Sequence, residues 1–217
     1  MAIRRPALWR KATLGLLMFV GLTFEVDARE YKVMGGFSLS RYDASGRFAT
    51  DYGYRPGFGF GMGVEFPVSR LFALEADIMY VQKGNDFSEW RDGALLERTV
   101  FKLEEISLPL LLKFRLRRGT SPFIASGIEL AYVLSHVAEP RADSTGPAGN
   151  EENLRDITKS FDAAIVFGAG LELAARAAAL SLEVRYHWGV WNILSESYSG
   201  FSRSKPNALV MLLGVRF

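Results

Sequence analysis

The chain has 217 residues, 49% of them hydrophobic, with 21 Gly, 16 Phe and no Cys. This length fits one domain or at most two, and the lack of Cys excludes disulfides and thiolate metal sites. Residues 1–28 hold four of the 26 basic and two of the 24 acidic residues, so the rest carries 22 of each. No basic excess points to nucleic-acid binding.

The N-terminal segment has the pattern of an export signal. Four basic residues precede an apolar run over 12–24, and Val26-Asp27-Ala28 has the small-residue spacing of a signal-peptidase site. The run is shorter than the roughly 20 residues with which a helix crosses a bilayer, which disfavours the alternative of an N-terminal membrane anchor. We predict a signal peptide over residues 1–28, cleaved after about Ala28, and one domain over residues 29–217.

From Tyr31 onward, apolar side chains alternate with small or polar ones, which is the period of a β-strand. The clearest segment has Phe58, Phe60, Met62, Val64 and Phe66 on one face and Gly57, Gly59, Gly61, Gly63 and Glu65 on the other. Eight such segments are predicted, at 31–40, 55–66, 71–83, 100–117, 122–134, 159–175, 180–190 and 206–217.

The connections between these segments alternate in length. Those at 67–70, 118–121 and 176–179 are tight, whereas those at 41–54, 84–99, 135–158 and 191–205 are long and polar. Short periplasmic turns and long extracellular loops are typical of transmembrane β-barrels. The pattern predicts an all-β fold, an eight-stranded antiparallel transmembrane β-barrel in the outer membrane, with both termini on the periplasmic side.

A soluble lipocalin-like barrel also alternates, but its apolar face points inward around a ligand. The glycine face of 55–66 fits the crowded inside of a narrow barrel, and the opposing Phe-rich face would overfill a small lumen. Five aromatic residues also fall near strand ends, where interfacial aromatics belong: Tyr80, Tyr132, Trp188, Trp191 and Phe217. The apolar face is therefore predicted to meet lipid.

Charged residues share the other face of the strands. A basic residue facing lipid costs about 2–4 kcal/mol at the mid-plane, so a dozen outward charges would exceed a total stability on the order of 10 kcal/mol. We predict instead a structural charge network that fills the lumen. It comprises Glu65, Glu75, Asp77, Glu105, Lys113, Arg115, Glu129, Glu183, Arg185 and Arg216, with Asp162, Glu172 and His187 on the same face.

Three segments carry a family resemblance: Leu108-Pro109-Leu110-Leu111-Leu112-Lys113, Pro122-Phe123-Ile124 with Gly127 and Tyr132, and Tyr186-His187-Trp188-Gly189-Val190-Trp191-Asn192-Ile193. They resemble strands of the PorT-like outer-membrane barrels of the Bacteroidota type. The resemblance implies an outer-membrane barrel and, as one alternative, a component of a type IX secretion apparatus. Pro109 would remove a ladder hydrogen bond inside its strand, and we expect a β-bulge there.

The last segment ends in an alternating apolar row of Leu209, Met211, Leu213, Val215 and Phe217. This row resembles the terminal signal by which outer-membrane barrels are recognised for insertion. Phe217 is therefore predicted to act as the C-terminal insertion signal, with the barrel assembly machinery as its partner. The alternative is an ordinary last strand that ends in Phe.

The sequence offers few candidates for catalysis. Neither His136 nor His187 stands in the His-x-Ser arrangement of an outer-membrane lipid deacylase. No phosphate loop, dinucleotide glycine motif or metal-ligand cluster is present. We expect no enzymatic activity, no catalytic residue, no cofactor and no metal.

The long loops are the other candidate location for function, with packing over the barrel mouth as the alternative for 84–99 and a solvated surface cover as the alternative for 135–158. Loop 84–99 contains Phe87, Trp90, Leu95 and Leu96, and loop 135–158 is rich in Pro and Gly. These two loops are the candidate contacts for a surface or secretion partner of a monomer that is embedded in outer-membrane lipid. The leading interpretation is a structural, surface-interaction or assembly-accessory role. The alternatives are a narrow pore or secretion-apparatus component, and a soluble lipocalin-like ligand-binding barrel.

Overall fold

The computed structural model describes residues 30–46, 51–91, 94–116, 120–142, 146–147, 150–174, 178–195 and 201–217. The predicted signal peptide lies outside these residues. Within the described ranges, no helix combines the length and the hydropathy that crossing a membrane requires.

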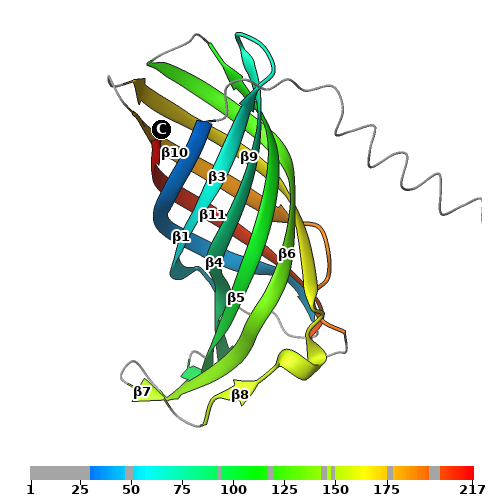
Figure 1. Cartoon of the computed structure of the whole chain (residues 1–217). Coiled ribbons are helices and arrows are strands. Elements are labelled where there is room, and N and C mark those ends of the chain that lie inside the picture. Colours follow the sequence, from blue (N-terminus) through cyan, green and yellow to red (C-terminus); the bar gives the residue numbers. More distant parts are fainter. Residues whose placement is uncertain are drawn as a thin grey trace, which may run out of the picture.

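Eight strands form one antiparallel sheet that closes on itself (Figure 1). Each strand pairs with the next around the ring, and the last strand pairs with the first. Closure gives the backbone N–H and C=O groups of the first and last strands hydrogen-bond partners, which lipid could not supply. In ring order the strands are β1 (Glu30–Gly46), β3 (Arg55–Pro67), β4 (Phe72–Arg91), β5 (Ala94–Arg115), β6 (Ser121–Ala142), β9 (Phe161–Ala174), β10 (Ala179–Gly189) and β11 (Phe201–Arg216). The predicted eight-stranded antiparallel fold is confirmed.

The two ends of the barrel differ. One end carries Glu30, Phe217 and the connections β3–β4, β5–β6 and β9–β10, and lies at the top of Figure 1. We call it the short-turn end. The opposite hairpin end carries four short elements: β2 (Asp51–Gly53) on β4, β7 (Gly146–Pro147) and β8 (Glu152–Asn153) on β6, and the 3-10 helix η2 (Arg155–Ile157).

At the hairpin end, β4, β5 and β6 run well beyond the strand ends that the sequence predicts. β4, β5 and β6 have 20, 22 and 22 residues, whereas β10 has 11. About 9–11 residues cross a bilayer. The predicted loop 84–99 is wrong in detail, because β4 and β5 continue as a hairpin until Arg91 pairs with Ala94. The predicted loop 135–158 also begins as strand, since β6 runs to Ala142.

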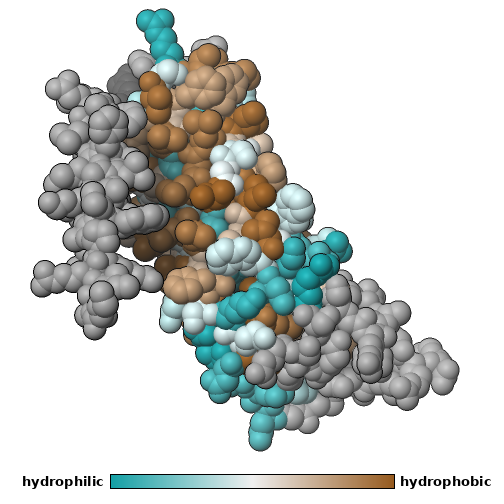
Figure 2. Space-filling view, turned by 90° about the vertical axis from the view of Figure 1, so that its right-hand side faces the viewer, coloured by the Kyte–Doolittle hydropathy of each residue, from teal (hydrophilic) through white to brown (hydrophobic). Residues whose placement is uncertain are grey.

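The outside of the barrel is apolar from the short-turn end to about the level of Tyr80 and Tyr132. Large apolar side chains point outward on every ring strand, among them Phe37, Phe60, Ile78, Leu110, Ile128, Phe167, Leu182 and Leu213. We call this surface the apolar belt. Figure 2 shows the hydrophobic surface giving way to a hydrophilic one at the hairpin end. The charged residues point inward along the belt, which is the reverse of a lipocalin.

The glycine row of β3 faces the crowded interior, as its pattern predicts. A Cβ at Gly61 would lie 2.7 Å from Cγ of Met79, and one at Gly63 would collide with the carboxylate of Asp77. Both neighbours belong to β4, the next strand of the ring. The glycines therefore allow β4 to place larger side chains in the lumen.

Pro109 lies inside β5 without a β-bulge. Its register with β6 runs unbroken through the pair Pro109↔Glu129, and the register shift of β5 falls between Glu104 and Glu105. On the other side, the ladder with β4 keeps one register but skips two positions, between the pairs Ala76↔Leu110 and Met79↔Ser107. The expected bulge is therefore wrong. A short interruption of one ladder accommodates the missing N–H.

Candidate functional site

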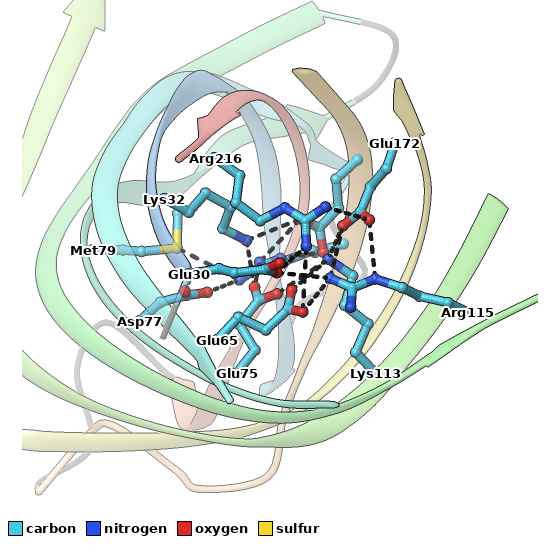
Figure 3. A network of polar contacts seen from close by, with 12 residues as sticks. Glu30, Lys32, Glu65, Glu75, Asp77, Met79, Lys113, Arg115, Glu172 and Arg216 are labelled. Carbon is cyan, nitrogen blue, oxygen red and sulfur yellow. Dashed lines mark hydrogen bonds and ion pairs between the residues drawn. The ribbon is translucent and has the colours of Figure 1, made fainter. Parts of the chain in front are cut away.

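Two clusters of charged side chains fill the interior of the barrel. The first, which we call the short-turn cluster, is drawn in Figure 3 and draws on every ring strand except β6. It comprises the carboxylates of Glu30, Glu65, Glu75, Asp77, Glu172 and Glu183 and the cations of Lys32, Lys113, Arg115, Arg185 and Arg216. Because β-strands alternate, each of these residues points inward while its chain neighbours contribute to the belt.

Arg185 joins opposite walls of the barrel. Its guanidinium is fully buried and donates to Glu183 on its own strand through Nε at 2.8 Å and Nη2 at 3.0 Å. It also donates through Nη1 to Asp77 at 2.6 Å and through Nη2 to Glu75 at 2.6 Å. Since β4 and β10 stand opposite each other in the ring, these contacts span the lumen.

Lys113 makes a second cross-link. Its Nζ lies 3.1 Å from Oε2 of Glu65 and 3.4 Å from Oε2 of Glu75, and it also pairs with Glu172 on β9, the second strand from β5 in the ring. The ring of Phe123, the interior contribution of β6, lies 3.9 Å from the ammonium. The planar fork of Arg115 shares Glu172 at 2.9 Å.

The second cluster, which we call the Lys83 cluster, lies further toward the hairpin end. Nζ of Lys83 is 2.8 Å from Oε2 of Glu105, 3.0 Å from Oε1 of Glu129 and 3.8 Å from Oδ2 of Asp162. Nδ1 of His187 is 2.8 Å from Oε2 of Glu129. Every member exposes 1% or less of its surface.

These clusters act chemically as cross-links and as filling. A buried charge whose partner is removed costs several kcal/mol, so each ion pair between strands holds those strands together. The described residues contain no group of three or more acidic or histidine side chains placed to hold a metal ion. His187 contacts Glu129, and no described serine or threonine bonds to it.

The structure places all ten residues of the predicted network in the interior. Glu105 and Glu129 belong to the Lys83 cluster, and the other eight belong to the short-turn cluster. Sequence reasoning missed Glu30, Lys32 and Lys83. The alternation contained a signal for two of them, because Lys32 falls between outward Tyr31 and Val33, and Lys83 continues the inward row of Glu75 and Asp77.

At the hairpin end the interior becomes apolar. A cluster that we call the hairpin core contains Tyr42, Phe87, Phe101, Leu103, Val133, Ala138, Leu154 and Ile193. Phe87, which the sequence places in a loop, is thus an interior residue with 9% exposure. The side chains of Trp90, Leu95 and Leu96 lie outside the described residues.

His136 is hydrogen-bonded at the edge of the hairpin core. Oγ1 of Thr158 donates to the carbonyl of Leu154 at 2.7 Å, so it accepts from Nδ1 of His136, also at 2.7 Å. Nε2 is then left to accept from the hydroxyl of Tyr42 at 3.2 Å. Burial lowers the pKa of His136 to about 4. His136 is therefore a neutral imidazole with both ring nitrogens hydrogen-bonded, and the hydroxyl of Thr158 donates its proton to the backbone carbonyl of Leu154.

The outer face of the hairpin end is charged. Nε of Arg98 donates to Oδ1 of Asp86 at 3.0 Å, and this contact raises the pKa of Arg98. Lys102 lies 2.6 Å from Oε2 of Glu139 and 3.2 Å from Oε1 of Glu151, and the bond to Lys102 lowers the pKa of Glu139. Partly exposed pairs of this kind contribute about 0–1 kcal/mol each.

Phe217 closes the seam between the first and last strands. Its N–H donates to the carbonyl of Tyr31, and its carbonyl accepts from the N–H of Tyr31, each at 2.9 Å. The two rings stack with centroids 6.5 Å apart, and 63% of Phe217 is exposed in the belt. Arg216 next to it points inward to the short-turn cluster.

The model of one protein family, described as outer membrane protein beta-barrel domain, matches residues 25–195. Among solved structures, the outer membrane protein OprG from Pseudomonas aeruginosa is 11% identical, with a TM-score of 0.50 over 88% of this chain and 96% of OprG. Ail of Yersinia pestis is 15% identical, with a TM-score of 0.41 over 87% of this chain and 98% of Ail. Neisserial surface protein A is 16% identical, with a TM-score of 0.41 over 86% and 95%. No curated protein sequence matches the chain.

Proposed function

The chain belongs to the outer membrane protein beta-barrel domain family, and on this premise we propose that it is a non-enzymatic barrel with a plugged lumen, monomeric in the membrane, that acts at the cell surface through its hairpin end. The observation that carries the proposal is the extension of β4, β5 and β6 beyond the belt. A barrel that served only as an anchor would need strands of the length of β10.

The interior supports a plugged lumen. Arg185 and Lys113 each reach carboxylates on more than one wall, and Lys83 fills the next layer. An eight-stranded barrel is just wide enough for side chains to fill its inside. Transport through a wide channel would require these buried pairs to separate, at a cost of several kcal/mol for each charge left without its partner.

The hairpin end supports a surface role because it is built as a rigid platform. Its interior is packed by the hairpin core, whereas its outer face carries the pairs Asp86–Arg98 and Lys102–Glu139. Segment 84–99 contributes Phe87 to the hairpin core, and segment 135–158 contributes Ala138 and Leu154. A packed and charged projection loses little conformational entropy on binding, which suits recognition of a partner.

Residue labelling on intact cells tests this topology directly, because the chain has no Cys. Asn150→Cys places a thiol at an exposed position of the hairpin end, and Ser69→Cys places one at an exposed position of the β3–β4 turn. A membrane-impermeant maleimide should label Asn150→Cys on intact cells and Ser69→Cys only after the outer membrane is permeabilised. Labelling of both, or of Ser69→Cys alone, would overturn the proposal.

Planar-bilayer recording tests the plug. The purified wild-type protein should give no large and stable conductance. A steady nonselective current would replace the proposal with the alternative of a pore. Reaction of the maleimide with a Ser107→Cys variant would also support a pore. Ser107 is fully buried, so the reagent could reach it only through an open lumen.

The finer assignment to PorT-like barrels rests on short segments of the wall. Leu108, Leu110 and Leu112 point outward from β5, and Tyr186 and Trp188 point outward from β10. These residues support a membrane barrel, and none of them lies in the platform at the hairpin end. Co-purification of the barrel with cargo-export components under mild detergent would favour the secretion alternative instead.

We also propose that residues 1–28 are removed on export, because β1 begins at Glu30, close behind Ala28. N-terminal sequencing of the protein from outer membranes should begin at Arg29. A protein that retains residues 12–24 would show that the segment is an anchor.

A further inference from the structure

A hollow of about 220 Å³ opens on the outside of the barrel, where the apolar belt meets the polar surface of the hairpin end. Leu39, Leu209 and Tyr186 line its belt side, and Arg41, Asn207 and Tyr54 line its polar side. They come from β1, β10 and β11 and from the connection between β2 and β3. The hollow therefore lies at the depth where lipid head groups meet acyl chains.

The strands that form the hollow change from polar to apolar across it. On β11 the outward row runs from Arg203, Lys205 and Asn207 to Leu209, and in the register Arg41 faces Asn207. From the hollow toward the short-turn end the row continues as Met211 and Leu213, which are 46% and 67% exposed. An amphiphile with its charged end at Arg41 could therefore lay its apolar chain along Leu209 and Met211 toward the belt.

The cations beside the hollow differ from those on the opposite side of the barrel. On β5 and β6, Arg98, Lys102 and Arg141 each pair with a carboxylate. Among the described residues, Arg41, Arg203 and Lys205 form no ion pair, although Asp43 faces Lys205 in the register. Counted over the described side chains, these three cations and Asp43 leave a local positive charge that is available to an anion.

Arg41 is oriented rather than free. Its guanidinium carbon lies 5.2 Å from the centroid of the Tyr54 ring, so a cation–π contact holds one face of the group. Such a contact leaves the N–H edge open, and this fork of donors matches the oxygens of a phosphate. Asn207 is held as well, since its Oδ1 accepts from the N–H of Gly189 at 3.0 Å.

We propose that this hollow binds an anionic phospholipid of the surrounding membrane. The phosphate contacts Arg41 and Lys205, and an acyl chain follows Leu39, Leu209 and Met211 along the belt. This binding goes beyond the proposed surface role and does not depend on it, because the site lies on the lipid-facing wall and not on the platform.

Native mass spectrometry of the protein from detergent micelles tests the proposal. The micelles contain equal amounts of dioleoyl phosphatidic acid and dioleoyl phosphatidylcholine, and bound lipids are counted per barrel. The wild type should retain more phosphatidic acid than phosphatidylcholine. The double variant Arg41→Gln/Lys205→Gln should lose this preference on the order of tenfold, as expected for two cations at a lipid surface. The matched control Arg98→Gln removes a paired cation on β5, and this variant should keep the preference for phosphatidic acid.

Three results would overturn the proposal: equal retention of both lipids by the wild type, an unchanged preference in the double variant, or an equal loss in Arg98→Gln. A further arm adds inorganic phosphate. Displacement of the lipid by millimolar phosphate would assign the site to a free anion instead. Each variant is first checked for heat-modifiable migration on gels, and Arg41→Lys, which keeps the charge, should retain the preference if the double variant does not fold.

Discussion

Arg185 on β10 donates from Nη1 to Oδ2 of Asp77 on β4 at 2.6 Å, from one wall of the barrel to the opposite one. The same guanidinium also pairs with Glu75 and Glu183, so one side chain contacts three buried carboxylates. Two walls that share no backbone hydrogen bond are thereby fixed relative to each other.

Replacement of Arg185 by Leu should destabilise the barrel by about 3–5 kcal/mol, because it leaves these carboxylates buried without their main partner. Urea unfolding in detergent, followed by tryptophan fluorescence, measures the change. Arg98→Leu is the control, since its pair with Asp86 is partly exposed and should contribute about 0–1 kcal/mol. Equal effects of the two substitutions would contradict a central role for Arg185.

The glycine row gives a prediction about space. Gly63→Ala should destabilise the barrel by about 1–3 kcal/mol, because the added methyl group collides with the carboxylate of Asp77. Gly35→Ala is a matched control on β1, where the nearest atoms lie 3.7 Å from the added Cβ. Urea midpoints in the same detergent compare the two. If Gly35→Ala proved as costly as Gly63→Ala, the clash with Asp77 would not explain the effect of Gly63→Ala.

His136 gives a prediction about pH. Its pKa in the folded protein is about 4, below the usual value of about 6.5, so the unfolded chain takes up the proton first. Its contribution to stability is complete above about pH 6.5 and declines as the pH falls through about 4. NMR of the labelled imidazoles should show no protonation of His136 at pH 5.5. The variant His136→Gln assigns the signal, and titration near pH 6.5 would contradict the buried geometry.

Phe217 gives a prediction about assembly. Deletion of Phe217 removes two backbone hydrogen bonds to Tyr31 and the last outward ring of β11, and we expect lower surface levels in cells with little change in detergent refolding. Surface labelling of an Asn150→Cys background measures these levels. Val215→Ala, which trims the same apolar row without shortening β11, is the control. Unchanged levels after the deletion would identify Phe217 as an ordinary strand end.

The sequence alone determined the number of strands and the faces of the barrel. In the segment 55–66 glycines alternate with large apolar residues, and Glu75, Asp77, Glu183 and Arg185 fall on one parity of their strands, because a strand sends alternate side chains to opposite faces. A polar interior of paired charges and an apolar exterior then follow from the cost of a charge in lipid.

Only the tertiary structure decided which charges meet and where the strands end. Alternation assigns Lys83 and Glu105 to a face, but their contact at 2.8 Å depends on the register between neighbouring strands. The hairpin end escaped prediction for a related reason. Beyond the belt the environment of the two faces reverses, so Phe87 and Phe101 point inward while Asp86 and Lys102 point outward. A strand that passes from lipid into water keeps its period of two, but its polar side chains now point outward and its apolar side chains inward. In a single sequence this exchange looks like the end of the strand pattern.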